Sequence, residues 1–353
     1  MLTYIFRRIM IIPLIMVGIS IMIFTMLSLL SPYERAALYI KEGQKHVAPI
    51  EDIVEKYDLD APIHIQYWNW MIGKEDPDTG EIKGGVLRGD LGWSQAGKST
   101  VAEAIGRRFP ASAELALWSA VPMVSFGIWM GIKAAANQNK LTDQILRVLA
   151  IAGWSIPTFV LGLLLLKFFY SEQGLFPPGR LSIDMKQVVL SDAFVQYTKM
   201  HTIDALLNLR LDVFFDAGRH LVLPVVTLSV MNWAFLLRVT RSAMLDTLRQ
   251  DYIVTARSKG LPEDQVINKH AVPNALVPVV TIGGLTMIGL FNAAVITETI
   301  FNFPGLGSFL VASMLDSVTL LGLTMFISLI FVFGNLIVDV LYGIVDPRIR
   351  LGA

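Results

Sequence analysis

The stretch Ala271–Thr297, AVPNALVPVVTIGGLTMIGLFNAAVIT, decides the class of fold, because its 27 consecutive residues contain no Asp, Glu, Lys or Arg. A helix that crosses a bilayer needs about 20 mostly apolar residues, since a backbone group without a partner is costly in lipid. Five more uncharged runs of similar length are Ile9–Tyr33, Leu115–Ile132, Val148–Leu166, Leu221–Leu237 and Ser317–Val338. The sequence therefore predicts an all-α membrane protein with six transmembrane helices.

The composition agrees with this class, because 54% of the 353 residues are hydrophobic and only 16% are charged. Lys plus Arg and Asp plus Glu both number 29, so no overall positive field favours nucleic acid as a partner. The chain has no Cys, which excludes disulfides, thiolate metal sites and thiol nucleophiles. The His residues lack metal-ligand spacing. We expect no metal site, no catalytic residue and no enzymatic activity.

Charge in the short loops predicts the orientation, because Lys and Arg are enriched in short cytoplasmic loops. The short segment Glu298–Asp316 has neither residue and is expected outside the cell. Both termini are then expected on the cytoplasmic side of the cell membrane. The first helix is longer than a secretory signal and is interpreted as an uncleaved anchor. The expected parts are the anchor 1–33, the extracytoplasmic region 34–108, the core 109–345 with five helices, and the cytoplasmic tail 346–353. Within the core, 238–270 is a cytoplasmic loop and 171–218 an outer insertion.

The uncharged run Thr299–Leu315 is not counted as a span. Phe303–Gly307, with the sequence FPGLG, should break a helix near its middle and leave a piece too short to cross. We interpret this run as a re-entrant or interfacial hairpin. Acidic residues at the edges of runs, namely Glu114, Glu298, Asp316 and Asp339, are expected to meet water at the membrane boundary.

Gly92–Ser99, GWSQAGKS, satisfies the phosphate-binding pattern of P-loop ATPases. That loop requires a buried strand before it and a helix after it. The preceding residues Gly84–Leu91 are rich in glycine and charge, which is not typical of a buried parallel strand. We therefore expect a solvated turn before a short helix, and no nucleotide site.

The cytoplasmic loop contains a short helix with an apolar side. Asp251 can cap its start, and Gly260 followed by Pro262 can end it. Tyr252, Ile253 and Ala256 are expected on one face, with basic residues beside them. Such a helix suits either docking onto a soluble partner or lying on anionic headgroups. If it docks, Ala256→Asp should uncouple transport without affecting membrane insertion.

A family resemblance favours docking. The residues Asp251–Pro262, DYIVTARSKGLP, with His270 and Pro273, resemble the EAA loop of the B-type permease subunits of dipeptide and oligopeptide ABC importers. Only Ala256, Gly260 and Pro273 match the general pattern of that loop literally. Further stretches that resemble this family are Gly89–Ser94, Ser155–Phe159, Glu298–Phe301, Phe303–Gly307, Asp339–Tyr342 and Asp346–Arg350. The segments Lys74–Gly85 and Ser171–Gly218 look like insertions, which leaves an oligosaccharide substrate open.

The resemblance implies a type I ABC importer permease fold and a set of partners. These are a second homologous permease, two cytoplasmic ATPase subunits, an extracytoplasmic solute-binding protein and membrane lipid. The chain itself would bind no cofactor, because ATP and Mg²⁺ would be held by the ATPase subunits. The residues implied in coupling to the ATPases are Asp251, Tyr252, Ile253, Thr255, Ala256, Arg257, Gly260 and Leu261. Those implied in the translocation pathway are Glu298, Phe301 and Pro304. The alternative is a secondary transporter or channel that works alone.

Overall fold

The computed structural model describes residues 2–37, 49–56, 58–75, 80, 82–314 and 316–345. It divides into two compact units. The core unit comprises Pro110–Gly307 and Gly334–Ala353, and the flanking unit comprises Leu2–Phe109 and Ser308–Phe333. Each is described by itself. The expected tail 346–353 lies outside the described residues.

The flanking unit begins with the long helix α1 and continues through short elements that join it to α5. Ser20 of α1 shares a hydrogen bond of 2.8 Å with the hydroxyl of Tyr67 on α4, and Phe24 packs edge-on against the same ring. The pairs β1–β2 and β3–β4 are antiparallel hairpins. The elements are α1 (Leu2–Leu27), α2 (Pro32–Ala37), α3 (Ile50–Lys56), α4 (Ile63–Ile72), β1 (Lys74–Glu75), β2 (Ile82–Lys83), the 3₁₀ turn η1 (Val86–Arg88), β3 (Trp93–Ser94), β4 (Ser99–Thr100), α14 (Leu306–Ala312) and the first half of α15 (Ser317–Val345).

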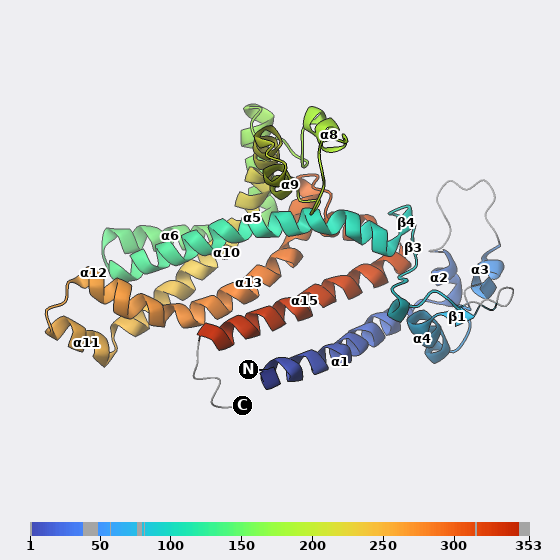
Figure 1. Ribbon diagram of the computed structural model, residues 1–353, viewed down its shortest axis with the longest axis horizontal. Helices are drawn as coiled ribbons and strands as arrows, with labels where there is room; N and C mark the ends of the chain where they lie inside the picture. The colour runs from blue at the N-terminus through green and yellow to red at the C-terminus, as the bar shows by residue number, and fades with distance from the viewer. Residues whose placement is uncertain are drawn as a thin grey trace. The chain divides into compact units, whose positions relative to one another are not determined.

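The core unit is built from long helices that pack side by side (Figure 1). Its elements are α5 (Val101–Ala136), α6 (Leu141–Ser155), α7 (Thr158–Leu165), the π-helical η2 (Leu166–Glu172), α8 (Ile183–Val189), α9 (His201–Leu207), α10 (Leu211–Leu248), α11 (Asp251–Ser258), α12 (Glu263–Gln265), the π-helical η3 (Val266–Ala271) and α13 (Val272–Ile300). α5 starts at Val101, well before the predicted run, so the short helix expected after the P-loop-like turn is the start of this long one.

Two glycines allow α5 and α10 to approach closely. A Cβ atom at Gly127 would overlap Leu236, and one at Gly131 would overlap Thr240. Small residues spaced four apart commonly permit such crossings in membranes. The buried cluster at this end of the core also joins α13, through Leu290 and Ala294.

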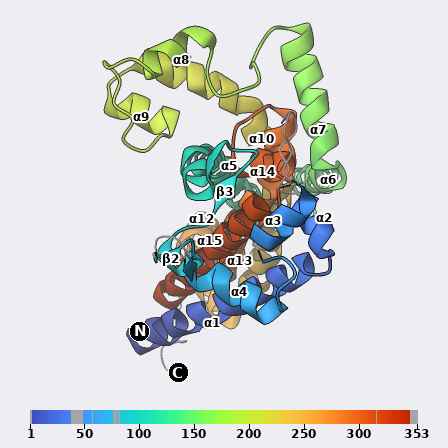
Figure 2. The same ribbon diagram turned by 90° about the vertical axis from the view of Figure 1, so that its right-hand side faces the viewer.

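The expected span Val148–Leu166 is not a straight helix. α6 and the pair α7–η2 are bent by 97° about a two-residue break. Ile156 has an extended backbone, with φ −82° and ψ 119°, because Pro157 disfavours the helical conformation of the residue before it. Figure 2 shows α6 nearly end on, with α7 extending upward from it.

The prediction of an all-α membrane protein is confirmed, and each of the six predicted runs overlaps a helix, although Ile9–Tyr33 extends past the end of α1 and Val148–Leu166 covers parts of two helices. Among the described residues, four helices are long and apolar enough to cross a membrane, and the bent α6–α7 pair makes a fifth candidate. Met10–Met26 in α1 is a shorter apolar helix. The predicted break in Thr299–Leu315 is also confirmed: α13 ends at Ile300, and α14 has only 7 residues.

Candidate functional site

α11 is the segment that the sequence singled out for coupling, and it begins one residue earlier than expected. Gln250, with φ −73° and ψ 149°, occupies the N-cap position without a side-chain hydrogen bond. Asp251 is the first helical residue, where its carboxylate favours the positive end of the helix dipole. The prediction of a short helix here is confirmed, and the assignment of Asp251 as its cap is wrong.

The end of α11 is a Schellman motif. The Leu261 N–H donates to the Ala256 carbonyl at 3.4 Å, and the Gly260 N–H donates to the Arg257 carbonyl at 2.9 Å. Gly260 has φ +75°, in the left-handed region, where a residue without a Cβ carries no steric penalty. Leu261 packs against the cluster that includes Ala256. These two residues therefore fix where the helix stops and where the chain turns back.

One side of α11 is buried in its own core unit. Ile253 is completely buried and Ala256 is nearly so. The buried residues of this cluster come from α5, α10, α11, η3 and α13, and are Ala135, Met244, Ile253, Ala256, Val266, Ala271 and Ala275. The expectation that Tyr252 shares this face is wrong, because Tyr252 is 43% exposed. Ile253 and Ala256 are occupied by contacts within the chain and do not present a docking surface.

The other side of α11 is open. Val254 is 54% exposed, and Tyr252, two residues earlier and therefore on the opposite flank of the helix, is 43% exposed. The hydroxyl of Thr255 donates to the Asp251 carbonyl at 2.9 Å, and that of Ser258 donates to the Val254 carbonyl at 3.0 Å. These hydroxyls are already used within the helix. Tyr252 and Val254 are thus the exposed apolar side chains of α11.

Arg257 lies next to this open surface and pairs with Glu263 of α12. Its Nε and Nη2 donate to the two carboxylate oxygens at 3.1 and 2.6 Å. The hydrogen bonds that Arg257 donates to this carboxylate raise the pKa of its guanidinium above the ordinary value. The pair is exposed, so it orients the loop more than it stabilises the fold.

An ion pair that sequence reasoning missed holds α6 against α10. Arg241 donates from Nε and Nη2 to Asp143, at 2.7 and 2.8 Å, in a bidentate geometry. Asp143 is completely buried and also accepts the Asn139 N–H at 3.0 Å. Arg241 falls within the segment 238–270, which was expected to be a cytoplasmic loop, and no partner was predicted for it. The available signal was Asp143 on the side of α6 that carries Leu146 and Ala150.

Three of the four acidic residues at run edges do not meet water as expected, whereas Asp339 is half-buried. Glu114, Glu298 and Asp316 are all buried. Glu298 accepts a hydrogen bond from the Ser112 hydroxyl, which in turn accepts the Leu306 N–H at 2.7 Å. A Cβ at position 305 would overlap the Glu298 carboxylate, which explains why a glycine stands there. This carboxylate binds the turn after α13.

The other two predicted pathway residues lie on that same turn. Phe301 is buried, and its carbonyl accepts the Gly179 N–H at 2.8 Å. Pro304 is exposed. Of the three residues implied in the pathway, only Pro304 presents its side chain to the surface of this chain.

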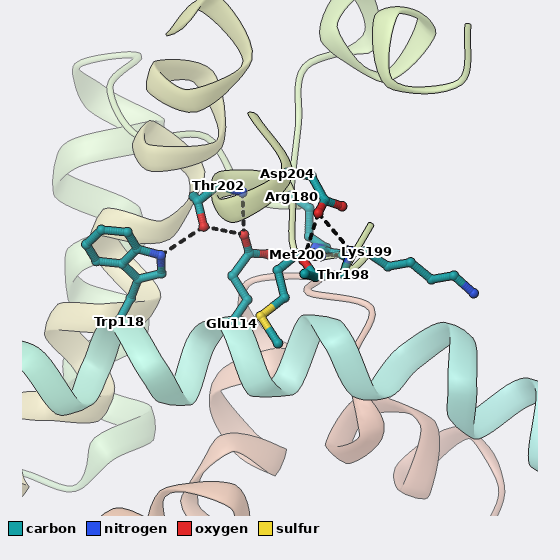
Figure 3. A network of polar contacts seen from close by, with 8 residues as sticks. All are labelled: Glu114, Trp118, Arg180, Thr198, Lys199, Met200, Thr202 and Asp204. Carbon is teal, nitrogen blue, oxygen red and sulfur yellow. Dashed lines mark hydrogen bonds and ion pairs between the residues drawn. The ribbon is translucent and has the colours of Figure 1, made fainter. Parts of the chain in front are cut away.

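Glu114 is the centre of a polar network between α5 and the 171–218 segment (Figure 3). Its carboxylate accepts both the N–H and the hydroxyl of Thr202 at 2.7 Å, and pairs with Arg180 at 2.6 Å. Trp118, one turn further along α5, donates its indole N–H to the Thr202 hydroxyl at 2.9 Å. Lys199 contributes its carbonyl, which accepts from Arg180 at 3.1 Å. The network docks α9 firmly against α5.

Asp316 fills the P-loop-like turn of the flanking unit. The N–H groups of Gln95 and Ala96 donate to its Oδ2 at 2.7 and 3.2 Å. β3 and β4 have two residues each and pair with each other around this turn, so the described residues contain no buried parallel strand leading into it, as a nucleotide loop requires. In the described part of the chain, no three His, Asp or Glu side chains are grouped so that they could hold a metal ion.

Comparison with known proteins gives the class of protein. Residues 123–351 match the family described as "Binding-protein-dependent transport system inner membrane component", and residues 1–116 match the N-terminal part of such membrane components. The chain belongs to this family of ABC importer permeases. The type I importer permease fold implied by the resemblance is that of the family.

Individual relatives indicate to which branch of the permease family the chain is most similar. The chain is 35% identical over 341 residues to the probable D,D-dipeptide transport system permease protein of Escherichia coli K12, covering 96% of this chain and 95% of the relative. It is 33% identical to the dipeptide transport system permease protein of the same strain, over 99% of each chain. It is 34% identical to the oligopeptide transport system permease protein AppB of Bacillus subtilis 168, over 99% of this chain and the whole relative. The resemblance to dipeptide and oligopeptide permeases is thereby confirmed.

A solved structure of the methionine ABC transporter MetNI, in an inward-facing conformation, is more distant. The sequence identity is 17% and the TM-score 0.45, over 65% of this chain and 92% of that one. A likeness at this level supports no argument about function.

Proposed function

We propose that this chain is one of two permease subunits that form the membrane channel of an ATP-driven importer of di- or oligopeptides. Its membership of the binding-protein-dependent family supports the importer class. The relatives at 33 to 35% identity are named for dipeptides and oligopeptides, which supports peptides as the substrate. An oligosaccharide substrate is the variant that a binding test must exclude.

The proposed partners supply what this chain lacks. Among the described residues the P-loop-like turn is filled by Asp316, so ATP and Mg²⁺ are assigned to two cytoplasmic ATPase subunits. An extracytoplasmic solute-binding protein delivers the substrate, and a second, homologous permease completes the channel. Both termini lie in the cytoplasm in this arrangement. Impermeant thiol labelling of intact cells tests it, because Gln187→Cys should react and Lys140→Cys should not.

The observation that carries the coupling proposal is the division of α11 into a buried side and an open side. Ile253 and Ala256 fasten the helix to a cluster that includes residues of α5, α10 and α13. Tyr252 and Val254 remain open for an ATPase subunit. A movement of the ATPases on binding ATP would reach three long helices through one packed cluster. Because packed interiors have low compressibility, the helix acts as a rigid lever.

A pair of matched variants tests this assignment. Val254→Asp places a carboxylate on the open side of α11, and Gln138→Asp places the same group in the exposed turn between α5 and α6. We expect Val254→Asp to abolish co-purification of the ATPase subunits and peptide uptake, while Gln138→Asp retains both. Both variants should insert and elute as the parent chain does. Full uptake with Val254→Asp would refute docking through this side.

The substrate is tested separately from the coupling. Calorimetry of the solute-binding protein encoded beside the permease, against peptides and oligosaccharides, should give heat only with peptides. Heat only with oligosaccharides would reassign the substrate and leave the coupling proposal intact. Solute uptake by the purified chain alone in liposomes, without ATPase subunits, would favour the stand-alone transporter instead.

We place the outer mouth of the pathway at the turn after α13. Pro304 is its exposed residue, and Phe301 supports it from within. Glu298, held by Ser112, fixes its shape. Uptake should fall with Glu298→Ala more than with Pro304→Ala, because the first removes the partner of a buried hydroxyl.

A further inference from the structure

The 171–218 segment carries an apolar surface that the transport proposal does not use. The exposed large side chains at the end of α9 and the start of α10 are Leu206, Leu207, Leu209, Leu211 and Phe215. They lie within ten consecutive positions and form the anchor segment, 206–215. A soluble loop would expose few such residues.

The polar network with α5 sets the depth of this segment relative to the membrane. The uncharged run of α5 starts at Leu115, directly after Glu114. Trp118 lies one turn inside that run. It bonds to Thr202 of α9, and its ring lies edge-on to Phe214 of α10 with centroids 6.4 Å apart. Trp is enriched at the boundary between headgroups and hydrocarbon. α9 and the first turns of α10 therefore lie level with that boundary, beside α5 (Figure 1).

The surface continues along a spanning helix. On α10, Leu211 and Phe215 are followed at helical spacing by the exposed Arg219, whose long side chain can reach headgroups, and then by Val222 and the exposed Val226. α10 is one of the four helices able to cross a membrane. Charges at the anchor segment are kept paired: Arg210 donates from Nε and Nη2 to Asp212 at 2.9 and 2.6 Å. This arrangement is typical of a surface whose apolar chains enter lipid while its ions stay among headgroups.

Leu209 is the most exposed of the large apolar residues in the anchor segment. It is 86% exposed and has φ +56°, in the left-handed region. It ends α9 in a Schellman motif, with the Arg210 N–H donating to the Ala205 carbonyl at 2.8 Å. Gly or Asn normally occupies this position. A leucine here is unfavourable for the turn and makes little contact within the chain, so its apolar side chain serves something outside the chain.

We propose that the anchor segment inserts Leu206, Leu207, Leu209 and Phe215 into the lipid interface of the leaflet at this end of α5, the outer one in the proposed orientation. Lipid is favoured over a soluble protein because the segment lies level with the start of the apolar run of α5, and because its surface continues the exposed side of α10. The 171–218 segment is then a membrane-lying platform, and not a projection into water.

Because the chain contains no Cys, single cysteines can carry a bimane fluorophore in the complete importer, reconstituted in vesicles of phosphatidylethanolamine and phosphatidylglycerol. Leu209→Cys is compared with Gln187→Cys, an exposed polar position on α8. We expect doxyl-labelled phospholipid to quench the fluorophore at Leu209 severalfold more than at Gln187, and iodide in the outer buffer to show the reverse order. Equal quenching by iodide at both positions would overturn the proposal. Protection from both quenchers, with crosslinking to another subunit, would also overturn it.

A second variant distinguishes insertion of Leu209 into lipid from a role of Leu209 in the stability of the fold. Leu209→Asn keeps the left-handed turn and removes the apolar chain. In detergent its melting temperature should equal or exceed that of the parent, whereas in vesicles a bimane at Leu207→Cys should become severalfold more accessible to iodide. A fall in the detergent melting temperature, or no change in access, would contradict the proposal. Neither readout requires transport, so failure here leaves the importer assignment standing.

Discussion

Gln95 donates its backbone N–H to the carboxylate of Asp316 across 2.7 Å, so a turn with a P-loop pattern is closed by an acid from the same unit. Ser94 and Ala96 point donors at the same carboxylate oxygen, at 3.5 and 3.2 Å. The Thr319 N–H donates to the other oxygen at 3.1 Å. In ATPases this sequence pattern binds the phosphates of a nucleotide. Here the donors of the turn bind the carboxylate of Asp316 instead.

Asp316→Ala should therefore destabilise the flanking unit. Each buried donor left without an acceptor costs roughly 1–3 kcal/mol, so the melting temperature of the purified chain in detergent should drop clearly. Asp316→Asn, which retains one carbonyl acceptor, should lie between. Lys98→Ala, in the exposed part of the same turn, should change neither the melting temperature nor the ATPase activity of the assembled importer. Loss of that activity with Lys98→Ala would restore the nucleotide interpretation.

Ala256→Asp should damage folding before it affects coupling. The residue is buried in the cluster of α5, α10, η3 and α13, and an unpaired carboxylate there is among the few substitutions that cost about 4 kcal/mol or more. Fluorescence-detected size exclusion should show aggregation or a lower yield of the protein. Normal elution and insertion with loss of uptake would mean that position 256 faces the partner after all, as the sequence suggested.

Gly260→Ala should cost about 1 kcal/mol through the left-handed backbone alone, because no atom lies within 4 Å of a Cβ built there. Gly260→Asn should cost less, since Asn tolerates this conformation. Thermal unfolding in detergent measures the order of the three residues. An alanine variant as stable as the parent would show that the turn after α11 adopts another conformation.

Because of His201, the stability of the folded 171–218 segment should depend on pH in the acid range. Burial, and then the nearby Arg180, lower the pKa of His201 from 6.5 to about 3. Below pH 6.5 the unfolded segment binds a proton that the folded one does not. Stability is therefore lost as the pH falls from 6.5 toward 3, by at most about 1.4 kcal/mol per pH unit.

Hydrogen exchange of α8 and α9 measures this effect. Protection should be lower at pH 5 than at pH 7.5 in the parent chain, and the difference should shrink in His201→Gln. If both proteins respond to pH equally, the imidazole is not the cause.

The spans and their breaks were predictable because they rest on local rules. Uncharged runs locate the helices, and Phe303–Gly307 ends α13 as Pro and Gly require. The extension of α5 back to Val101 was not visible, since Arg107 and Arg108 interrupt the apolar pattern without interrupting the helix. The size of the bend at Pro157, 97°, could not be predicted, because a rule that counts apolar length gives no angle.

The candidate site was predictable in position but not in orientation. Spacing placed Tyr252, Ile253 and Ala256 together, yet which side of a short helix is buried depends on what packs against it. That information lies in Met244 and Val266, which are distant along the chain or beyond a turn. The burial of Glu114 and Asp143 has the same origin, because Thr202 and Arg241 become partners only in the folded chain.

The most direct test of the account is photocrosslinking from the open side of α11 in the native importer. With benzoylphenylalanine in place of Tyr252, ultraviolet light should give a covalent adduct to an ATPase subunit. The same probe at Gln138 should give none, or far less. An adduct to lipid alone, or no ATPase adduct from Tyr252 in an importer that still transports peptide, would contradict the claim that this helix receives the ATPases.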